Sequence, residues 1–249
     1  MGFRAGRREL AQYFTPQVVA RFVFDALREL GFSMPRPRVI DPACGEGVFV
    51  AEAARQLPEA DVWGCDVDEN LRGRWRQTHL ERRGIRLLIQ DGLADSSEAG
   101  IAAGRFDLVV GNPPYGLGLR RPVRGEPIES AFVRRFVDLA REGGWLAVVV
   151  PEGILANERS QPLREWLLDR VAPRGVVSLP ESTFAAADTR ARTALLFAQK
   201  GGEPNGEVLM AAPLGNCQGK GALSSYLASV LTNIREHESR VPSGRHRRA

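Results

Sequence analysis

Short apolar runs alternate along this chain with longer stretches in which apolar residues recur every three or four positions. The runs are typical of buried strands and the stretches of amphipathic helices. The predicted strands are Arg38–Asp41, Asp61–Asp66, Arg86–Gln90, Phe106–Gly111, Trp145–Val150, Gly175–Leu179 and Thr193–Gln199. The predicted helices are Val48–Gln56, Asn70–Arg83, Pro127–Glu142 and Gln161–Val171. Strands joined by helical crossovers pair in parallel, so we expect an α/β fold with a doubly wound, mostly parallel, seven-stranded sheet.

The organisation of the chain changes after the last predicted strand. A candidate linker, Gly201–Gly206, is followed by a segment that could add a strand, Val208–Ala212, by a helix-like stretch, Ala222–His237, and by a basic tail. We therefore expect one main domain over residues 1–200. Residues 201–249 form a short C-terminal extension that is too small for a separate recognition domain.

Composition indicates an ordinary globular protein. Of the 249 residues, 43% are hydrophobic and 26% are charged, which are typical globular values. The three cysteines, Cys44, Cys65 and Cys217, lack the paired spacing of zinc ligands, so we expect no metal site and a reducing compartment. No run of about 18 apolar residues predicts a membrane span. We expect a cytoplasmic protein with no membrane partner.

The most informative motif is Asn112-Pro113-Pro114-Tyr115, which follows the apolar run Phe106–Gly111, where a buried strand should open into a loop. Two successive prolines remove two backbone donors and hold the segment extended. The Asn112 side-chain carbonyl and the Pro113 main-chain carbonyl could both accept a hydrogen bond from an exocyclic amino group. Tyr115 could stack on a base turned out of its helix. The alternative is a rigid turn beside a core tyrosine.

A second group of residues indicates a nucleotide-like ligand. The strand that ends at Asp41 turns through Gly45-Glu46-Gly47 into a helix, where glycines allow close approach and free N–H groups face a ligand. Asp66, at the next strand end, has nearly the spacing of a ribose-binding acid. Asp91 follows the third strand and could accept a hydrogen bond from an adenine amino group. The third glycine of a dinucleotide fingerprint is absent, which favours a smaller adenosyl ligand.

Charge adds one candidate interface. The net charge is +4, and 32 of the 34 basic residues are arginines. This bias fits either phosphate binding or genomic composition. Arg120, Arg121 and Arg124 lie just beyond the Asn-Pro-Pro-Tyr motif. They could grip a nucleic-acid backbone, although a solvated charged loop is the usual meaning of such a cluster.

Five segments taken in order resemble the S-adenosylmethionine-dependent DNA adenine-N6 methyltransferases of the gamma arrangement, and most closely the modification subunits of type I restriction systems. These segments are Tyr13-Phe14-Thr15-Pro16, Asp41-Pro42-Ala43-Cys44-Gly45-Glu46-Gly47, Asp66, Asp91 and Asn112-Pro113-Pro114-Tyr115. The resemblance covers about residues 10 to 200 and is far more specific than any one motif. It implies a Rossmann-like methyltransferase domain in that part of the chain.

The resemblance also implies roles for individual residues. Catalysis would rest on Asn112, Pro113, Pro114 and Tyr115. The cofactor S-adenosyl-L-methionine would be bound by Tyr13, Thr15, Pro16, Asp41, Ala43, Gly45, Asp66, Asp91 and Asn112. Phe184 would contact the flipped base, with a core position as the alternative. DNA would be the substrate, and a specificity subunit or other partner would supply target recognition.

Three other functions stay open. An RNA adenine-N6 methyltransferase uses a similar Asn-Pro-Pro-aromatic motif without a large recognition domain. A protein-glutamine N5-methyltransferase acts on an amide nitrogen with the same motif, although the Tyr13-Phe14-Thr15-Pro16 segment disfavours it. A cofactor-binding subunit without activity is the third, and the intact Asn112 and Tyr115 argue against it.

Overall fold

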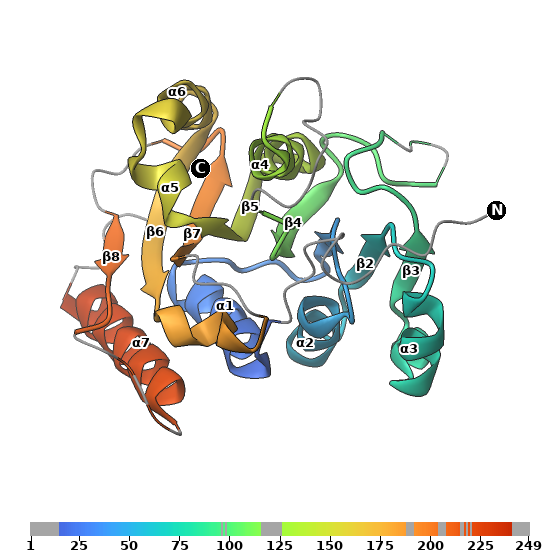
Figure 1. Cartoon of the computed structure of the whole chain (residues 1–249), viewed down its shortest axis with the longest axis horizontal. Coiled ribbons are helices and arrows are strands. Elements are labelled where there is room, and N and C mark those ends of the chain that lie inside the picture. Colours follow the sequence, from blue (N-terminus) through green and yellow to red (C-terminus); the bar gives the residue numbers. More distant parts are fainter. Residues whose placement is uncertain are drawn as a thin grey trace.

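The computed structural model describes residues 15–95, 97, 99–115, 126–187, 192–203, 208–214, 217, 219 and 221–240. These residues build one eight-stranded sheet in the order β3-β2-β1-β4-β5-β7-β6-β8 (Figure 1). The strands are β1 (Arg38–Asp41), β2 (Asp61–Asp66), β3 (Arg86–Ile89), β4 (Phe106–Gly111), β5 (Ala140–Pro151), β6 (Val171–Leu179), β7 (Thr193–Lys200) and β8 (Leu209–Ala211).

The sheet is mostly parallel, as predicted. Strands β3, β2, β1, β4 and β5 are parallel to one another, whereas β7 is antiparallel to both β5 and β6. The sheet has eight strands rather than the predicted seven, because the short segment β8 pairs in parallel with β6 at the edge. That strand lies within the candidate segment Val208–Ala212.

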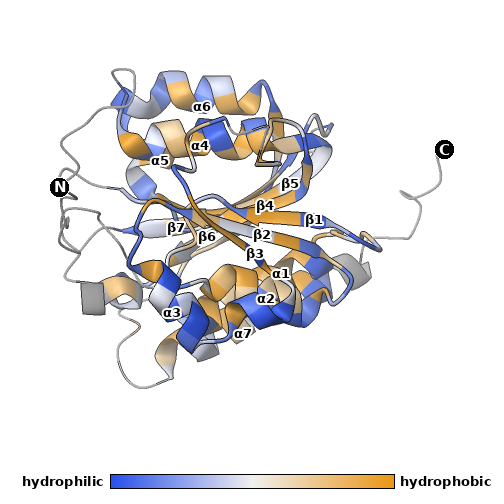
Figure 2. Ribbon diagram, turned by 90° about the vertical axis from the view of Figure 1, so that its right-hand side faces the viewer, coloured by the Kyte–Doolittle hydropathy of each residue, from blue (hydrophilic) through white to orange (hydrophobic). Residues whose placement is uncertain are grey.

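Helices cover both faces of the sheet. In the edge-on view of Figure 2, α1, α2, α3 and α7 lie on one face and α4, α5 and α6 on the other. The α-helices are α1 (Gln17–Glu29), α2 (Val48–Gln56), α3 (Leu71–Gln77), α4 (Ile128–Leu139), α5 (Glu152–Ala156), α6 (Gln161–Leu168) and α7 (Ala222–Arg240). The 3₁₀ turns are η1 (Leu80–Arg83), η2 (Glu158–Ser160) and η3 (Glu181–Ala187). Each face carries its own hydrophobic core, as expected for a doubly wound sheet.

Two predicted helices end differently in the structure. The stretch Asn70–Arg83 is broken at His79, whose φ of 55° is left-handed and cannot continue a right-handed helix; α3 ends before it and η1 follows. The stretch Pro127–Glu142 ends as α4 at Leu139, because residue 140 already begins β5. Both boundaries are set by tertiary pairing and backbone geometry rather than by side-chain periodicity.

The first helix, α1, is absent from the predicted elements. It buries a face that includes Val19, Val23 and Leu27 in the core, and it packs against α7, with an ion pair between Arg235 and Glu29. Within the described residues, none of the helices is long and apolar enough to cross a membrane.

Candidate active site

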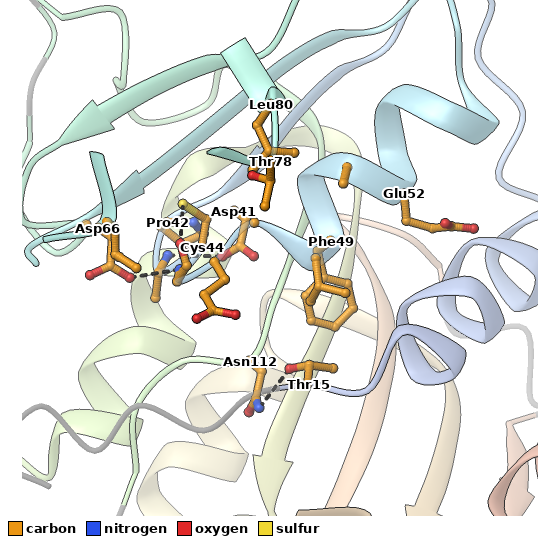
Figure 3. Close-up of a pocket in the computed structure, with 18 of the residues that line it drawn as sticks. Thr15, Asp41, Pro42, Cys44, Phe49, Glu52, Asp66, Thr78, Leu80 and Asn112 are labelled. Atoms are coloured by element: carbon orange, nitrogen blue, oxygen red, sulfur yellow. Dashed lines mark hydrogen bonds between the residues drawn. The ribbon is translucent and has the colours of Figure 1, made fainter. Parts of the chain in front are cut away.

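A cavity of about 510 Å³ opens at the carboxyl ends of β1, β2 and β4 (Figure 3), the edge at which α/β sheets bind ligands. Its lining includes the glycine turn Gly45-Glu46-Gly47, the strand-end acids Asp41 and Asp66, and Asn112 beyond β4. The two predicted motifs, far apart in the sequence, therefore share one cavity. Its volume falls in the range of small-molecule sites.

The glycine turn has a shape that other residues would not adopt easily. Gly45 and Gly47 have φ values of +52° and +88°, in the left-handed region that glycine enters at little cost. A Cβ on Gly47 would lie 2.5 Å from Cδ1 of Leu80. The Trp75 indole N–H donates to the carbonyl oxygen of Gly45 at 2.8 Å. Trp75 of α3 and Leu80 of η1 thus hold the turn in place.

Asp41 is a buried carboxylate at the end of β1, with 1% of its surface exposed. Its Oδ1 accepts a hydrogen bond from the Ala43 N–H at 3.0 Å. Burial raises the pKa of Asp41 to about 8; the Ala43 hydrogen bond opposes the shift and the negative charge of Asp66 adds to it. A cation in the cavity would favour the ionised form, because opposite charges lower the pKa of a carboxyl group.

Asp66 and Asp91 each order the turn that follows their strand. Asp66 accepts hydrogen bonds from the N–H groups of Gly45 at 2.9 Å and Asp68 at 3.0 Å, and burial raises its pKa. Asp91 accepts a hydrogen bond from the Leu93 N–H at 2.9 Å. Both acids also line the cavity. They therefore have a structural task that is compatible with ligand contact.

Asn112 bridges the cavity to the beginning of the described chain. Its Nδ2 donates to Oγ1 of Thr15 at 3.1 Å (Figure 3). Its Oδ1 is buried and accepts no hydrogen bond from any residue that the structure describes. Buried polar atoms are nearly always hydrogen-bonded. An acceptor in this position indicates a donor that arrives with a ligand.

The rest of the Asn-Pro-Pro-Tyr motif is only partly in the cavity. Pro114 lines it, and Pro113 is buried. Tyr115 is 1% exposed and Phe184 is 2% exposed, and neither ring lines the cavity. Phe184 packs in the core on the face of α1, α2 and α7. Such a core position was the predicted alternative to contact with a flipped base. Stacking of either ring on a base would require these segments to move, so both roles stay predictions.

The remaining predicted cofactor and substrate residues fall into three groups. Thr15, Ala43 and Gly45 line the cavity, whereas Pro16 is the N-cap residue of α1 and is not in the lining. Outside the described residues lie Tyr13, Arg120, Arg121 and Arg124.

Several lining residues are absent from the sequence prediction. Gly92 follows Asp91, and a Cβ there would lie 1.7 Å from the carbonyl oxygen of Pro42; a glycine directly after a strand-end acid was the available signal. Phe132, on α4, and Leu80 also line the cavity. Nothing in the sequence separates them from ordinary core residues.

Comparison with known proteins gives consistent matches. The N-6 DNA Methylase family model matches residues 4–221. The type II methyltransferase M.CvrRI of Paramecium bursaria Chlorella virus XZ-6E is 24% identical over 193 residues, which cover 72% of this chain and 46% of the relative. The tRNA (guanine(6)-N2)-methyltransferase of Thermus thermophilus is 31% identical over 183 residues, which cover 70% of this chain and 50% of that relative. This chain thus spans about half the length of these curated relatives.

The solved structures agree on the fold. The type I restriction-modification system methyltransferase subunit from Streptococcus thermophilus superposes with a TM-score of 0.69 at 19% identity, over 90% of this chain and 53% of that chain. The fold is that of the S-adenosylmethionine-dependent methyltransferases. Because the family match covers most of its length, the chain belongs to the N-6 DNA Methylase family.

Proposed function

We propose that this chain transfers a methyl group from S-adenosylmethionine to the N6 amino group of adenine in DNA. The single observation that carries the proposal is made at Asn112, which lines the cavity and whose buried Oδ1 accepts no hydrogen bond from any described residue. An exocyclic amino group is a donor that this atom can receive. Family membership supports the same chemistry.

The lining of the cavity fits the cofactor. Gly45, just before α2, has no heavy atom within 4 Å of its Cβ position, and three acids, Asp41, Asp66 and Asp91, line the same cavity. Carboxylates can accept hydrogen bonds from ribose hydroxyls and from an adenine amino group, and they attract a cationic sulfur. We assign Asp66 to the ribose, Asp91 to the adenine, and Asp41, Ala43 and Thr15 to the remaining part. When bound, S-adenosylmethionine supplies the methyl group on that sulfur.

Asn112 would act by holding the target nitrogen. Its Oδ1 and the main-chain carbonyl of Pro113 would accept hydrogen bonds from the two amino hydrogens, which draws the nitrogen lone pair out of conjugation with the ring. The Thr15 contact holds Nδ2 and so leaves Oδ1, among the described residues, as the free acceptor of the amide. Orientation and electrostatic stabilisation would supply most of the rate, and no enzyme nucleophile is needed. The adenine would have to leave the base stack to reach this cavity.

One observation favours a second candidate, an RNA substrate. The Thermus relative, at 31% identity, is a tRNA methyltransferase by name. It acts on guanine, whereas the matched family is named for DNA N6 methylation. DNA adenine therefore remains the first proposal, and such a substrate fits the cytoplasmic location expected from the sequence.

Target recognition is the part that we assign to a partner. The structurally similar Streptococcus protein is a methyltransferase subunit of a type I system by name. We propose that this chain likewise works with a specificity subunit or a comparable recognition partner. The arginines 120, 121 and 124 are our candidates for backbone contacts with the nucleic acid.

The test is transfer of labelled methyl groups to duplex DNA and to structured RNA, by the wild type, Asn112→Ala and Asn157→Ala. Asn157 is a control because it lies outside the cavity lining. We expect N6-methyladenine in DNA. In Asn112→Ala, the rate of methyl transfer should fall about 100- to 1,000-fold, the effect of losing one positioned hydrogen-bonding group of an active site, while cofactor binding should stay largely intact. An Asn112→Ala variant with wild-type turnover would refute the assignment. Labelling of RNA alone would support the second candidate instead.

A further inference from the structure

Arg135 is a buried cation on α4 that no predicted motif includes. Its side chain is 7% exposed. The Nε group donates to the carbonyl oxygen of Gly92 at 3.1 Å, and Nη2 donates to those of Ala94 at 2.7 Å and Ile101 at 3.4 Å. All three acceptors belong to the connection between β3 and β4. Among the described residues, none offers Arg135 a carboxylate within ion-pair distance.

The connection that Arg135 holds forms one wall of the cavity. Asp91 and Gly92 line the cavity. Gly92 packs directly against the carbonyl group of Pro42, which also lines the cavity. Phe132, one turn before Arg135 on the same helix, also lines the cavity. Arg135 therefore links α4 to the backbone around Asp91 through hydrogen bonds.

An arginine is a costly residue for this position. Burying a charge without a carboxylate partner is unfavourable unless its donors are all used, and an apolar side chain would pack beside Phe132 and Phe136 without that cost. The guanidinium, however, presents several donors in a fixed planar arrangement. That arrangement can hold three separated carbonyls of an irregular segment at once. A lysine has three donors but on a single nitrogen, so it cannot reach the same positions, and an apolar residue has none.

We propose that Arg135 is a positioning residue that sets the selectivity of the cavity for the adenine ring of the cofactor. It does so by fixing residues 91–94, so that the Asp91 carboxylate is held for the adenine 6-amino group. The inference rests on the proposed function, because it takes S-adenosylmethionine as the cofactor and Asp91 as its adenine contact. It adds a determinant outside the cavity lining.

The experiment compares binding of two ligands by calorimetry, so that methyl transfer is not needed. One ligand is S-adenosylhomocysteine, and the other is the same compound with the adenine 6-amino group replaced by hydrogen. The proteins are the wild type, Arg135→Met, Arg135→Lys and Arg164→Met. Arg164 is a matched control, since its guanidinium also donates to two main-chain carbonyls, those of Ile154 and Asn157, but lies outside the cavity lining.

We expect the wild type and Arg164→Met to prefer the amino ligand by about tenfold or more, the usual effect of a hydrogen bond to a charged group. The preference should fall to about threefold or less in Arg135→Met and in Arg135→Lys. Arg135→Lys keeps the charge, and it serves as the test if Arg135→Met does not fold. A folded Arg135 variant with the wild-type preference would overturn the inference. A wild type that binds neither ligand would instead overturn the proposed cofactor.

Hydrogen exchange gives an independent readout. Exchange of the backbone N–H groups of residues 91–105 should be faster in Arg135→Lys than in the wild type, with the strands of the sheet unchanged. In Arg164→Met, the faster exchange should be confined to residues 152–164. Equal protection of residues 91–105 in Arg135→Lys and the wild type would also overturn the inference.

Discussion

The carboxylate of Asp41 occupies the space into which a side chain on Gly111 would project: a Cβ on Gly111 would lie 2.6 Å from Oδ1 of Asp41. Gly111 is the last residue of β4 and directly precedes Asn112. The Asp41 carboxylate and the segment that leads into Asn112 are thus in contact through a glycine, which explains why this residue type ends the strand.

Gly111→Ala should therefore disturb both sides at once. We expect the free energy of unfolding to fall by about 1–3 kcal/mol, as for other overpacked sites, and binding of S-adenosylhomocysteine to weaken. Denaturant unfolding and calorimetry measure the two effects. Gly73→Ala is the control, because no heavy atom lies within 4 Å of its Cβ position in α3; it should be neutral or stabilising. Unchanged ligand binding in Gly111→Ala would contradict this explanation.

Thr15 should matter for turnover more than for stability. Thr15→Val removes the acceptor for Nδ2 of Asn112, so the amide loses its fixed orientation. We expect kcat to fall by about 2- to 10-fold, the range of one neutral hydrogen bond. Thr15→Ser, which keeps the hydroxyl, should stay near the wild type. Steady-state kinetics with both variants test this, and a loss in Thr15→Ser with none in Thr15→Val would show that the methyl group rather than the hydroxyl matters.

Asp41 makes the stability of the ligand-free protein depend on pH. Its pKa is raised from an ordinary 3.8 to about 8, so the folded state holds this proton more firmly than the unfolded state does. The resulting stabilisation is fully present below about pH 4 and is lost as the pH rises through about 8. Between pH 6 and 9 the wild type should lose more stability than Asp41→Asn. Chemical denaturation at several pH values measures this, with the exposed Asp169→Asn as control.

Trp75 should support ligand binding through the glycine turn. Trp75→Phe removes the hydrogen bond to the Gly45 carbonyl while keeping most of the buried surface. We expect S-adenosylhomocysteine to bind about 2- to 10-fold more weakly. Trp145→Phe is the control, because Trp145 is also buried but lies outside the cavity lining; it should leave the affinity unchanged. Equal affinities in both variants would show that the indole hydrogen bond has no part in binding.

Much of the fold could be predicted because strands here are short, apolar and regularly spaced. The ranges of β1, β2 and β4 agree with the prediction residue for residue. The helix α1 was not predicted, because it lies before the first strand, outside the alternation of strands and helices on which the prediction depends. The break at His79 could not be predicted, because a left-handed φ is uncommon for non-glycine residues, even for histidine, which adopts it more often than most.

Lining residues with a distinctive functional group could be predicted from the sequence. Residues that reach the site only through the packing of their helix could not. Asp41, Asp66 and Asn112 were identified because strand-end acids and a proline-flanked amide are informative by themselves. Phe132 and Arg135 were not, since a ring or a charge on an amphipathic helix has no local signal. Their place depends on how α4 packs on the connection between β3 and β4.

The contact between Thr15 and Asn112 joins residues 97 positions apart. Closing so long a loop is entropically unfavourable until the strands between them have formed. On the ribosome, Thr15 emerges early and has no partner until β4 is synthesised. The orientation of the Asn112 amide is therefore acquired only after β4 has joined the sheet, and a fragment without the residues before α1 can have an assembled sheet and yet lack this contact.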